Sequence, residues 1–119
     1  MIKLISLSKN TEFRRIIKEK KLNTDYFTIY YDKNPIASKT NLSISFVMKK
    51  KIGNAVKRNK IKRKLKAAVQ KTLKEEQPLD LNYTYVIFGK NNVYKDKFVF
   101  VLSEVNEAFK KIKQISGQK

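Results

Sequence analysis

The chain has 119 residues, with 28 Lys and Arg against 10 Asp and Glu, so its formal net charge is +18. Hydrophobic residues make up 41% of the sequence, which is enough for the folded core of one domain and argues against wholesale disorder. The absence of cysteine and histidine excludes disulfides, thiolate metal sites and catalysis by Ser-His, Cys-His or zinc-hydrolase centres.

The first half of the chain predicts one helix and two strands. We expect residues 1–7 to form a short arm and residues 9–20 to form a helix with Phe13, Ile16 and Ile17 on one side. The segment TDYFTIYY (24–31) alternates as a strand does, with aromatic residues on both faces. After a polar connector, LSISFVM (42–48) alternates apolar residues with serines, which predicts a second strand with one face on the core.

The second half predicts a turn, a long helix, a strand and a last helix. Gly53 and Asn54 mark the turn. The helix from Ala55 to Glu76 carries one apolar stripe, and Ile52 and Val56 fall off this stripe, so we expect them to pack in the loop or first turn. YTYVIFGK (83–90) is apolar enough on both sides to be a central strand. The last helix begins at about residue 95, and residues 115–119 form a frayed tail.

This order of elements predicts an α+β fold, an α/β sandwich in which helices cover a small mixed sheet of three to four strands. The sheet has room for one further short strand, but the sequence pattern does not assign it to particular residues. Residues 1–119 are expected to form a single domain. An apolar run as short as that in MIKLISLSK does not make a signal peptide, and no segment has the roughly 18 apolar residues that cross a bilayer. We therefore expect a soluble, cytoplasmic protein.

The most unusual stretch is KKKIGNAVKRNKIKRKLK (49–66). It lies in an interval without any acidic residue, between Asp32 and Glu75, that holds half of all Lys and Arg. Successive residues of a helix are about 100° apart, so the face opposite the apolar stripe centred on Leu65 is exposed to solvent. That face carries Asn59, Lys60, Arg63 and Lys66, with Arg58 and Lys62 at its border. Such a face suits a line of phosphates, since Arg and Lys bind phosphate oxygens and Asn can contact a sugar or base edge.

Alternatives to RNA binding remain at this point. The basic face could simply be solvated, or it could be a membrane-surface or calmodulin-target helix, although its apolar stripe has no aromatic anchor. Aromatic residues of the first strand and first helix, namely Tyr26, Phe27, Tyr30 and Phe13, could stack on single-stranded nucleic acid or could belong to the core. The ten carboxylates are scattered, and Asp25, Asp32 and Asp96 are best explained as turn or cap residues. If a reaction is involved, its chemistry is expected to belong to a partner.

The run KKKIGNAVKRNKIKRKLK resembles the signature of the bacterial ribonuclease P protein subunit. The segments NTEF, YFTIYY, LSISFV and YTYVIFGK occur along the chain in the same order as in the family. The resemblance therefore covers about residues 7–113. It implies an α/β sandwich like the second domain of ribosomal protein S5, with a left-handed crossover. It also implies binding of the catalytic RNA and of the 5′ leader of precursor tRNA. In that family the RNA cuts the leader and holds Mg²⁺, and the protein has no cofactor or small-molecule substrate of its own.

Carried over residue by residue, the resemblance implies two groups of site residues. The RNA-binding group comprises Lys49, Lys50, Lys51, Asn54, Arg58, Asn59, Lys60, Lys62, Arg63 and Lys66. The leader cleft comprises Phe13, Ile17 and Tyr30. Lys60 and Lys66 stand where arginine is common, and Ile17 stands where an aromatic residue is frequent. The alternatives to this family are another basic RNA-binding protein, such as a ribosomal component, or a peripheral membrane-surface protein.

Overall fold

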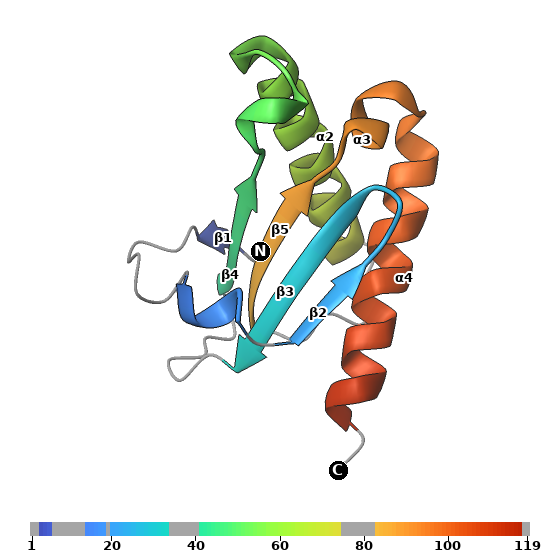
Figure 1. Ribbon diagram of the computed structural model, residues 1–119. Helices are drawn as coiled ribbons and strands as arrows, with labels where there is room; N and C mark the ends of the chain where they lie inside the picture. Colours follow the sequence, from blue (N-terminus) through green and yellow to red (C-terminus); the bar gives the residue numbers. More distant parts are fainter. Residues whose placement is uncertain (1–2, 6–13, 19, 34–40, 75–82, 118–119) are drawn as a thin grey trace.

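A computed structural model describes residues 3–5, 14–18, 20–33, 41–74 and 83–117 of the chain (Figure 1). Its strands are β1 (Lys3–Ile5), β2 (Lys20–Asn23), β3 (Phe27–Lys33), β4 (Asn41–Val47) and β5 (Tyr83–Gly89). Its helices are η1 (Lys50–Ile52), α2 (Ala55–Lys74), α3 (Asn91–Lys95) and α4 (Phe98–Gly117). Residues 14–16 form a further helical turn. The α+β class and the order of the main elements are those that the sequence predicts.

The strands form one mixed sheet in the order β1-β4-β5-β3-β2. The central strand β5 pairs antiparallel with β3, where Ile29 lies opposite Ile87, and parallel with β4, where Ile44 lies opposite Tyr85. Five strands exceed the predicted three to four because two short segments pair at the edges, β1 with β4 and β2 with β3. The prediction of a central strand over residues 83–90 is confirmed.

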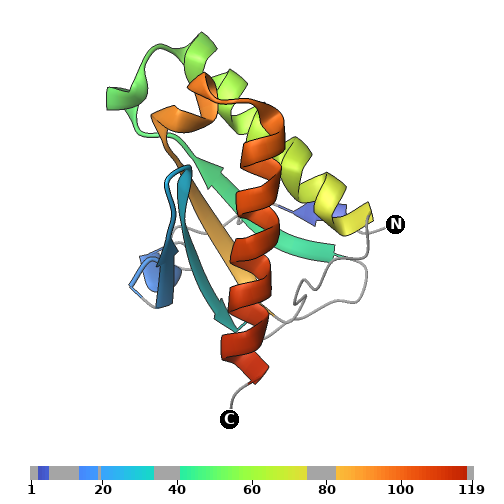
Figure 2. The same ribbon diagram turned by 90° about the vertical axis from the view of Figure 1, so that its right-hand side faces the viewer.

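The connection from β4 through α2 to β5 is left-handed. In Figure 1 both strands point upward, β5 lies to the right of β4, and α2 runs behind the sheet. Connections between parallel strands are almost always right-handed, so this crossover is a rare exception. It places the basic helix on the same face of the sheet as α4 (Figure 2).

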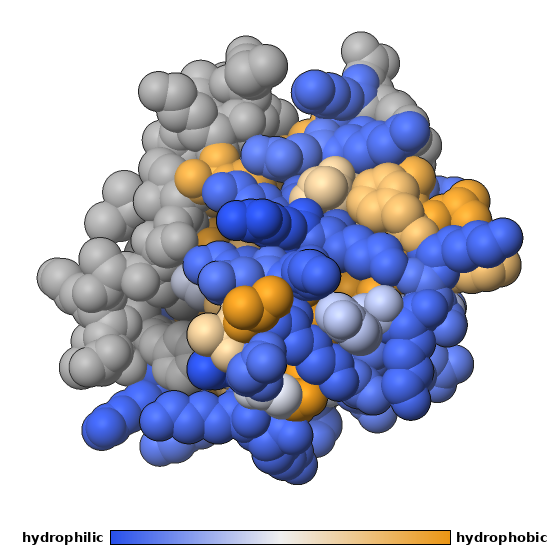
Figure 3. Space-filling model, turned by 90° about the horizontal axis from the view of Figure 1, so that it is seen from above, coloured by the Kyte–Doolittle hydropathy of each residue, from blue (hydrophilic) through white to orange (hydrophobic). Residues whose placement is uncertain are grey.

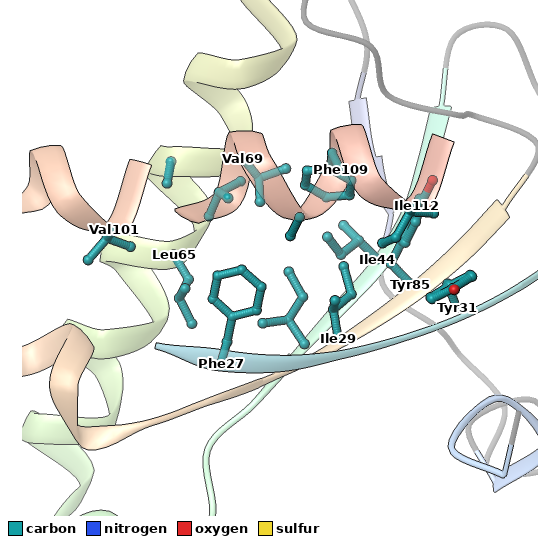
Figure 4. Packing of buried hydrophobic residues seen from close by; sticks show 14 of the residues in the cluster. Phe27, Ile29, Tyr31, Ile44, Leu65, Val69, Tyr85, Val101, Phe109 and Ile112 are labelled. Carbon is teal, nitrogen blue, oxygen red and sulfur yellow. The ribbon is translucent and has the colours of Figure 1, made fainter. Parts of the chain in front are cut away.

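The main core lies between this face of the sheet and the two long helices (Figure 4). Alternate residues of β3, Phe27, Ile29 and Tyr31, point toward α4 and are at most 3% exposed. The ring of Tyr85 on β5 meets that of Phe109 on α4 edge to face, with 5.2 Å between centroids. The predicted stripe of α2 is confirmed, since its buried residues are Ile61, Leu65, Ala68, Val69 and Thr72.

On the opposite face of the sheet, residues 14–18 lie in front of the lower ends of the strands in Figure 1. Ile16 in this segment and Val86 on β5 are both fully buried but lie outside the main core cluster. The sheet is therefore packed on both faces; among the described residues, the segment on the front face is much shorter than the two helices on the back.

Several predicted boundaries near the N-terminus are wrong. The helix predicted for 9–20 ends earlier, because Lys20–Asn23 pairs with β3 as an edge strand, where lysines can stay in solvent. Part of the predicted arm is strand β1. The strand predicted for 24–31 begins only at Phe27, because Thr24 closes the turn: its Oγ1 accepts a hydrogen bond from the Phe27 amide at 3.0 Å. Residues 9–13 lie outside the described residues.

Further differences lie at the helices. The last helix is preceded by α3 and begins after a break at Asp96, whose backbone is extended; it continues to Gly117 through part of the predicted tail. Ile52 packs against the core, as predicted, but Val56 is 64% exposed because the first turn of α2 projects beyond the sheet. No helix in the described part of the chain is both long and apolar enough to cross a membrane.

Candidate nucleic-acid interface

The basic helix starts at a defined cap. Gly53, with a φ of 157°, turns the chain out of η1, and the Oδ1 of Asn54 accepts a hydrogen bond from the Lys57 amide at 2.9 Å. This side-chain bond satisfies one of the free amides of the first helical turn. Asn54, predicted as an RNA ligand, therefore has a structural role as the N-cap of α2.

The outward side of α2 is a cationic surface, which we call the α2 face. Its side chains are exposed and comprise Asn59, Lys60, Lys62, Arg63 and Lys66. Among the residues that the structure describes, none of these four cations pairs with a carboxylate. Seen from above, the coloured part of the surface is largely hydrophilic, with hydrophobic patches between the hydrophilic side chains (Figure 3). Unneutralised charges on one helix side repel one another, which favours binding of a polyanion.

Arg58 differs from the other cations of α2. It is half-buried, and its Nε is buried without a hydrogen-bond partner among the described residues. Lys64 also turns inward, because its Nζ donates to the backbone carbonyl of Asp96 in the link between α3 and α4. The predicted border position of Arg58 is confirmed, and this residue is partly structural.

A hollow of about 530 Å³ opens on the sheet, next to residues 14–18. Its lining residues come from four segments of the chain: Ile17, Thr28, Tyr30, Val47, Lys49 and Phe88. The rings of Tyr30 and Phe88 meet edge to face with 5.5 Å between centroids. The Nζ of Lys49 lies 5.7 Å from the centre of the Phe88 ring. Aromatic rings beside a cation are the combination that binds unpaired bases and their phosphates.

A second hollow of about 450 Å³ continues the first toward η1 and α3. Both hollows share Thr28, Lys49 and Phe88, and we call the two together the sheet groove. The second hollow adds Lys51, Ile52, Gly89, Lys90 and Asn91 to the lining. The groove thus runs from the open face of the sheet to the loop that starts α2.

The structure brings part of the predicted leader cleft together. Ile17 and Tyr30 of the predicted leader cleft share the groove with Lys49, and Lys51 lines its extension. Lys50 is exposed but lines neither hollow. Phe13 lies outside the described residues.

Two aromatic residues do not join the groove. Phe27 is 1% exposed in the core, because it lies on the face of β3 that meets the helices. Tyr26 lies at the turn before β3, where its hydroxyl donates to Asp96 Oδ2 at 2.6 Å. This hydrogen bond, with a smaller contribution from desolvation, raises the pKa of Tyr26 to about 12. Neither residue therefore serves as a free stacking platform.

Sequence reasoning missed Phe88, Thr28 and Val47 in the groove. Phe88 alternates with the buried Ile87, and the register places it opposite Thr28 of β3. Strict alternation along YTYVIFG could have assigned Phe88 to the second face. The alternation is obscured because both faces of this strand carry apolar residues, a pattern that predicts a strand buried on both faces.

Comparison with known proteins identifies the fold and its family. Residues 1–113 match the family model described as Ribonuclease P. The chain belongs to the ribonuclease P protein family. It is 35% identical to the ribonuclease P protein component of Carboxydothermus hydrogenoformans over 109 residues, covering 91% of this chain and 90% of that protein. It is 33% identical to the component of Mesoplasma florum over 102 residues, covering 85% and 88% of the two chains.

Solved structures show the same fold. The ribonuclease P protein of Thermotoga maritima matches with a TM-score of 0.73 at 22% identity, covering 90% of this chain and 96% of that chain. The protein of Staphylococcus aureus matches with a TM-score of 0.67 at 24% identity, covering 90% and 93%. Ribonuclease P is an endoribonuclease that processes tRNA, and its catalysis lies in its RNA. The family therefore gives this chain the role of a tRNA-processing subunit partnered with that RNA.

Proposed function

We propose that the α2 face binds the catalytic RNA of ribonuclease P and that the sheet groove binds the 5′ leader of precursor tRNA. The observation that carries this proposal is the joining of two different surfaces at one loop. The groove extends to Lys51 in η1, and α2 begins directly after this loop. One RNA complex can therefore contact both surfaces at once.

The two surfaces suit different forms of RNA. The α2 face offers exposed cations along a rigid helix, which suits the phosphates of a folded RNA. The groove offers Tyr30 and Phe88 beside the ammonium of Lys49, which suits the unstacked bases of a single strand. A leader is single-stranded, so it fits the groove better than the helix face.

The part assigned to the protein is electrostatic and positional. Lysine and arginine side chains neutralise phosphates that would otherwise repel one another when RNA and substrate meet. Magnesium ions do the same work, so bound protein should lower the magnesium concentration that cleavage requires. We propose that the catalytic Mg²⁺ stays with the RNA. The described residues contain no cluster of three or more acidic, His or Cys side chains that could hold a metal ion.

Reconstitution with the cognate catalytic RNA tests this proposal. Cleavage of precursor tRNA is measured against magnesium concentration, with and without the protein. We expect the protein to shift the curve to lower magnesium. A Lys110→Ala variant serves as a control, since it removes an exposed cation from α4 and should shift the curve as the unaltered protein does. An unchanged curve with the unaltered protein would contradict the proposal.

A further inference from the structure

We propose that Tyr94 of α3 is a stacking platform for one unpaired nucleotide of the catalytic RNA, at the edge of the α2 face. Tyr94 is 44% exposed and lies outside the core cluster. The ammonium groups of Lys57 and Lys60 lie 5.1 and 6.0 Å from its centre. The inference rests on the proposed function, because it takes the α2 face as the RNA-binding surface.

The site has the shape and charge that a nucleotide needs. Lys60, Lys64 and Tyr94 line a hollow of about 430 Å³ between α2 and α3. A nucleotide presents a flat base and an anionic phosphate a few ångströms apart, so a ring with cations about 6 Å away matches both parts. Figures 1 and 2 show α3 beside the first turns of α2, so the platform adjoins the exposed cations of that helix.

The fold does not need this ring for its core. Val93, the neighbouring residue, is fully buried and anchors α3. The helix is held further by two hydrogen bonds to the turn before β3: the Asn92 amide side chain donates to the Asp25 carbonyl at 2.9 Å, and the Lys90 amide donates to the Tyr26 carbonyl at 2.9 Å. These contacts fix α3, so Tyr94 is held in a defined position while its ring stays open.

Catalytic RNA fits this site better than the leader does. The sheet groove opens on the front of the sheet, where Tyr30 and Phe88 already provide aromatic rings. Tyr94 contacts α2 instead, through Lys57 and Lys60, and α2 lies behind the sheet. A nucleotide stacked on Tyr94 would therefore belong to the RNA that follows the α2 face.

The absence of tryptophan from the chain allows a direct test. A Tyr94→Trp variant carries a single indole at the site, and a stacked base should quench its fluorescence. Gln114→Trp, on an exposed position near the far end of α4, is the matched control. We expect catalytic RNA to quench the indole at position 94 at least twice as strongly as the one at 114. Precursor tRNA without catalytic RNA should leave both unquenched. Equal quenching at both positions, or quenching at 94 that requires precursor tRNA, would overturn the proposal.

Affinity measurements separate stacking from charge. A base that stacks on an aromatic ring stabilises the complex, so Tyr94→Ala should weaken catalytic-RNA binding about tenfold, or about 1.4 kcal/mol. The salt dependence should stay unchanged, since no cation is removed. Tyr94→Phe should bind like the unaltered protein. Unaltered affinity in Tyr94→Ala would exclude the platform, whereas failure of the unaltered protein to bind catalytic RNA would instead contradict the proposed function.

Discussion

The sheet groove takes its lining from separate segments of the chain, whereas the α2 face comes from one continuous helix. Ile17, Tyr30, Lys49 and Phe88 reach the groove only after the strands have paired. The exposed cations of α2 share one side through helical periodicity alone. The groove should therefore depend on the tertiary fold more strongly than the α2 face does, and the two surfaces can be disturbed separately.

The largest effect is expected at Gly89, which lies between the sheet groove and the buried side of α2. Gly89 lines the groove, and a Cβ there would lie 2.6 Å from Met48 Sδ, 2.9 Å from Ile61 Cγ2 and 3.0 Å from Leu65 Cδ1. Because overpacking a close contact costs about 1–3 kcal/mol, Gly89→Ala should lower the free energy of unfolding by that amount. Urea unfolding measures this change. The exposed Gln70→Ala should stay within about 0.5 kcal/mol of the unaltered protein; equal stability of both variants would contradict this packing.

The next effect tests the α2 face. Arg63→Ala should weaken binding of catalytic RNA about tenfold, since a hydrogen bond to a charged group contributes about 1.5 kcal/mol. The slope of log affinity against log salt should become shallower by up to about 0.9 if one phosphate contact is lost. Arg63 is preferred to Arg58 because Arg63 is exposed and Arg58 is half-buried, so the Arg63 substitution should not disturb folding. Lys110→Ala should leave the slope unchanged, and an unchanged slope in Arg63→Ala would remove this residue from the interface.

A smaller, more selective effect is expected in the groove. Tyr30→Ala should weaken holoenzyme binding of precursor tRNA by about fivefold, corresponding to the ~1 kcal/mol of a weak stacking contact. Binding of mature tRNA, which lacks the leader, should not change. Tyr30→Phe keeps the ring and should behave as the unaltered protein does. Equal losses for precursor and mature tRNA in Tyr30→Ala would place Tyr30 outside the leader site.

The smallest effect concerns the hydrogen bond between Tyr26, in the turn before β3, and Asp96, in the link between α3 and α4. The Tyr26 hydroxyl donates to Asp96 and has a pKa of about 12, above its ordinary value of 10. This bond therefore contributes its full stability below about pH 10 and loses it as the pH rises toward 12. The difference in free energy of unfolding between the unaltered protein and Tyr26→Phe should shrink over that range. A difference that does not vary with pH would show that the hydroxyl bond is unimportant.

Much of the fold follows from periodicity, and the rest depends on pairing. The stripe through Ile61 and Leu65 predicts α2, and alternation along 42–48 predicts β4, because each pattern reports which side is buried. Strands β1 and β2 have no such pattern. Lys20–Asn23 is a strand because β3 offers free backbone groups at its edge, and sequence alone does not reveal that neighbour.

The candidate site divides in the same way. Helical spacing places Asn59, Lys60 and Arg63 on one exposed side, as the structure has them. The groove required the register between strands, which sets Phe88 opposite Thr28 and next to Tyr30. Only the family resemblance places Ile17 and Tyr30 in one cleft. Tyr94 gave no signal in the sequence, because its site exists only where α3 packs beside α2.

The dependence of holoenzyme affinity on leader length tests the central claim most directly. Precursor tRNAs with successively longer leaders are bound to holoenzyme reconstituted with the unaltered protein or with Tyr30→Ala. We predict that affinity for the unaltered holoenzyme rises with leader length until the sheet groove is filled, and that Tyr30→Ala flattens this rise. An affinity that is independent of leader length in the unaltered holoenzyme would contradict the assignment of the groove to the leader.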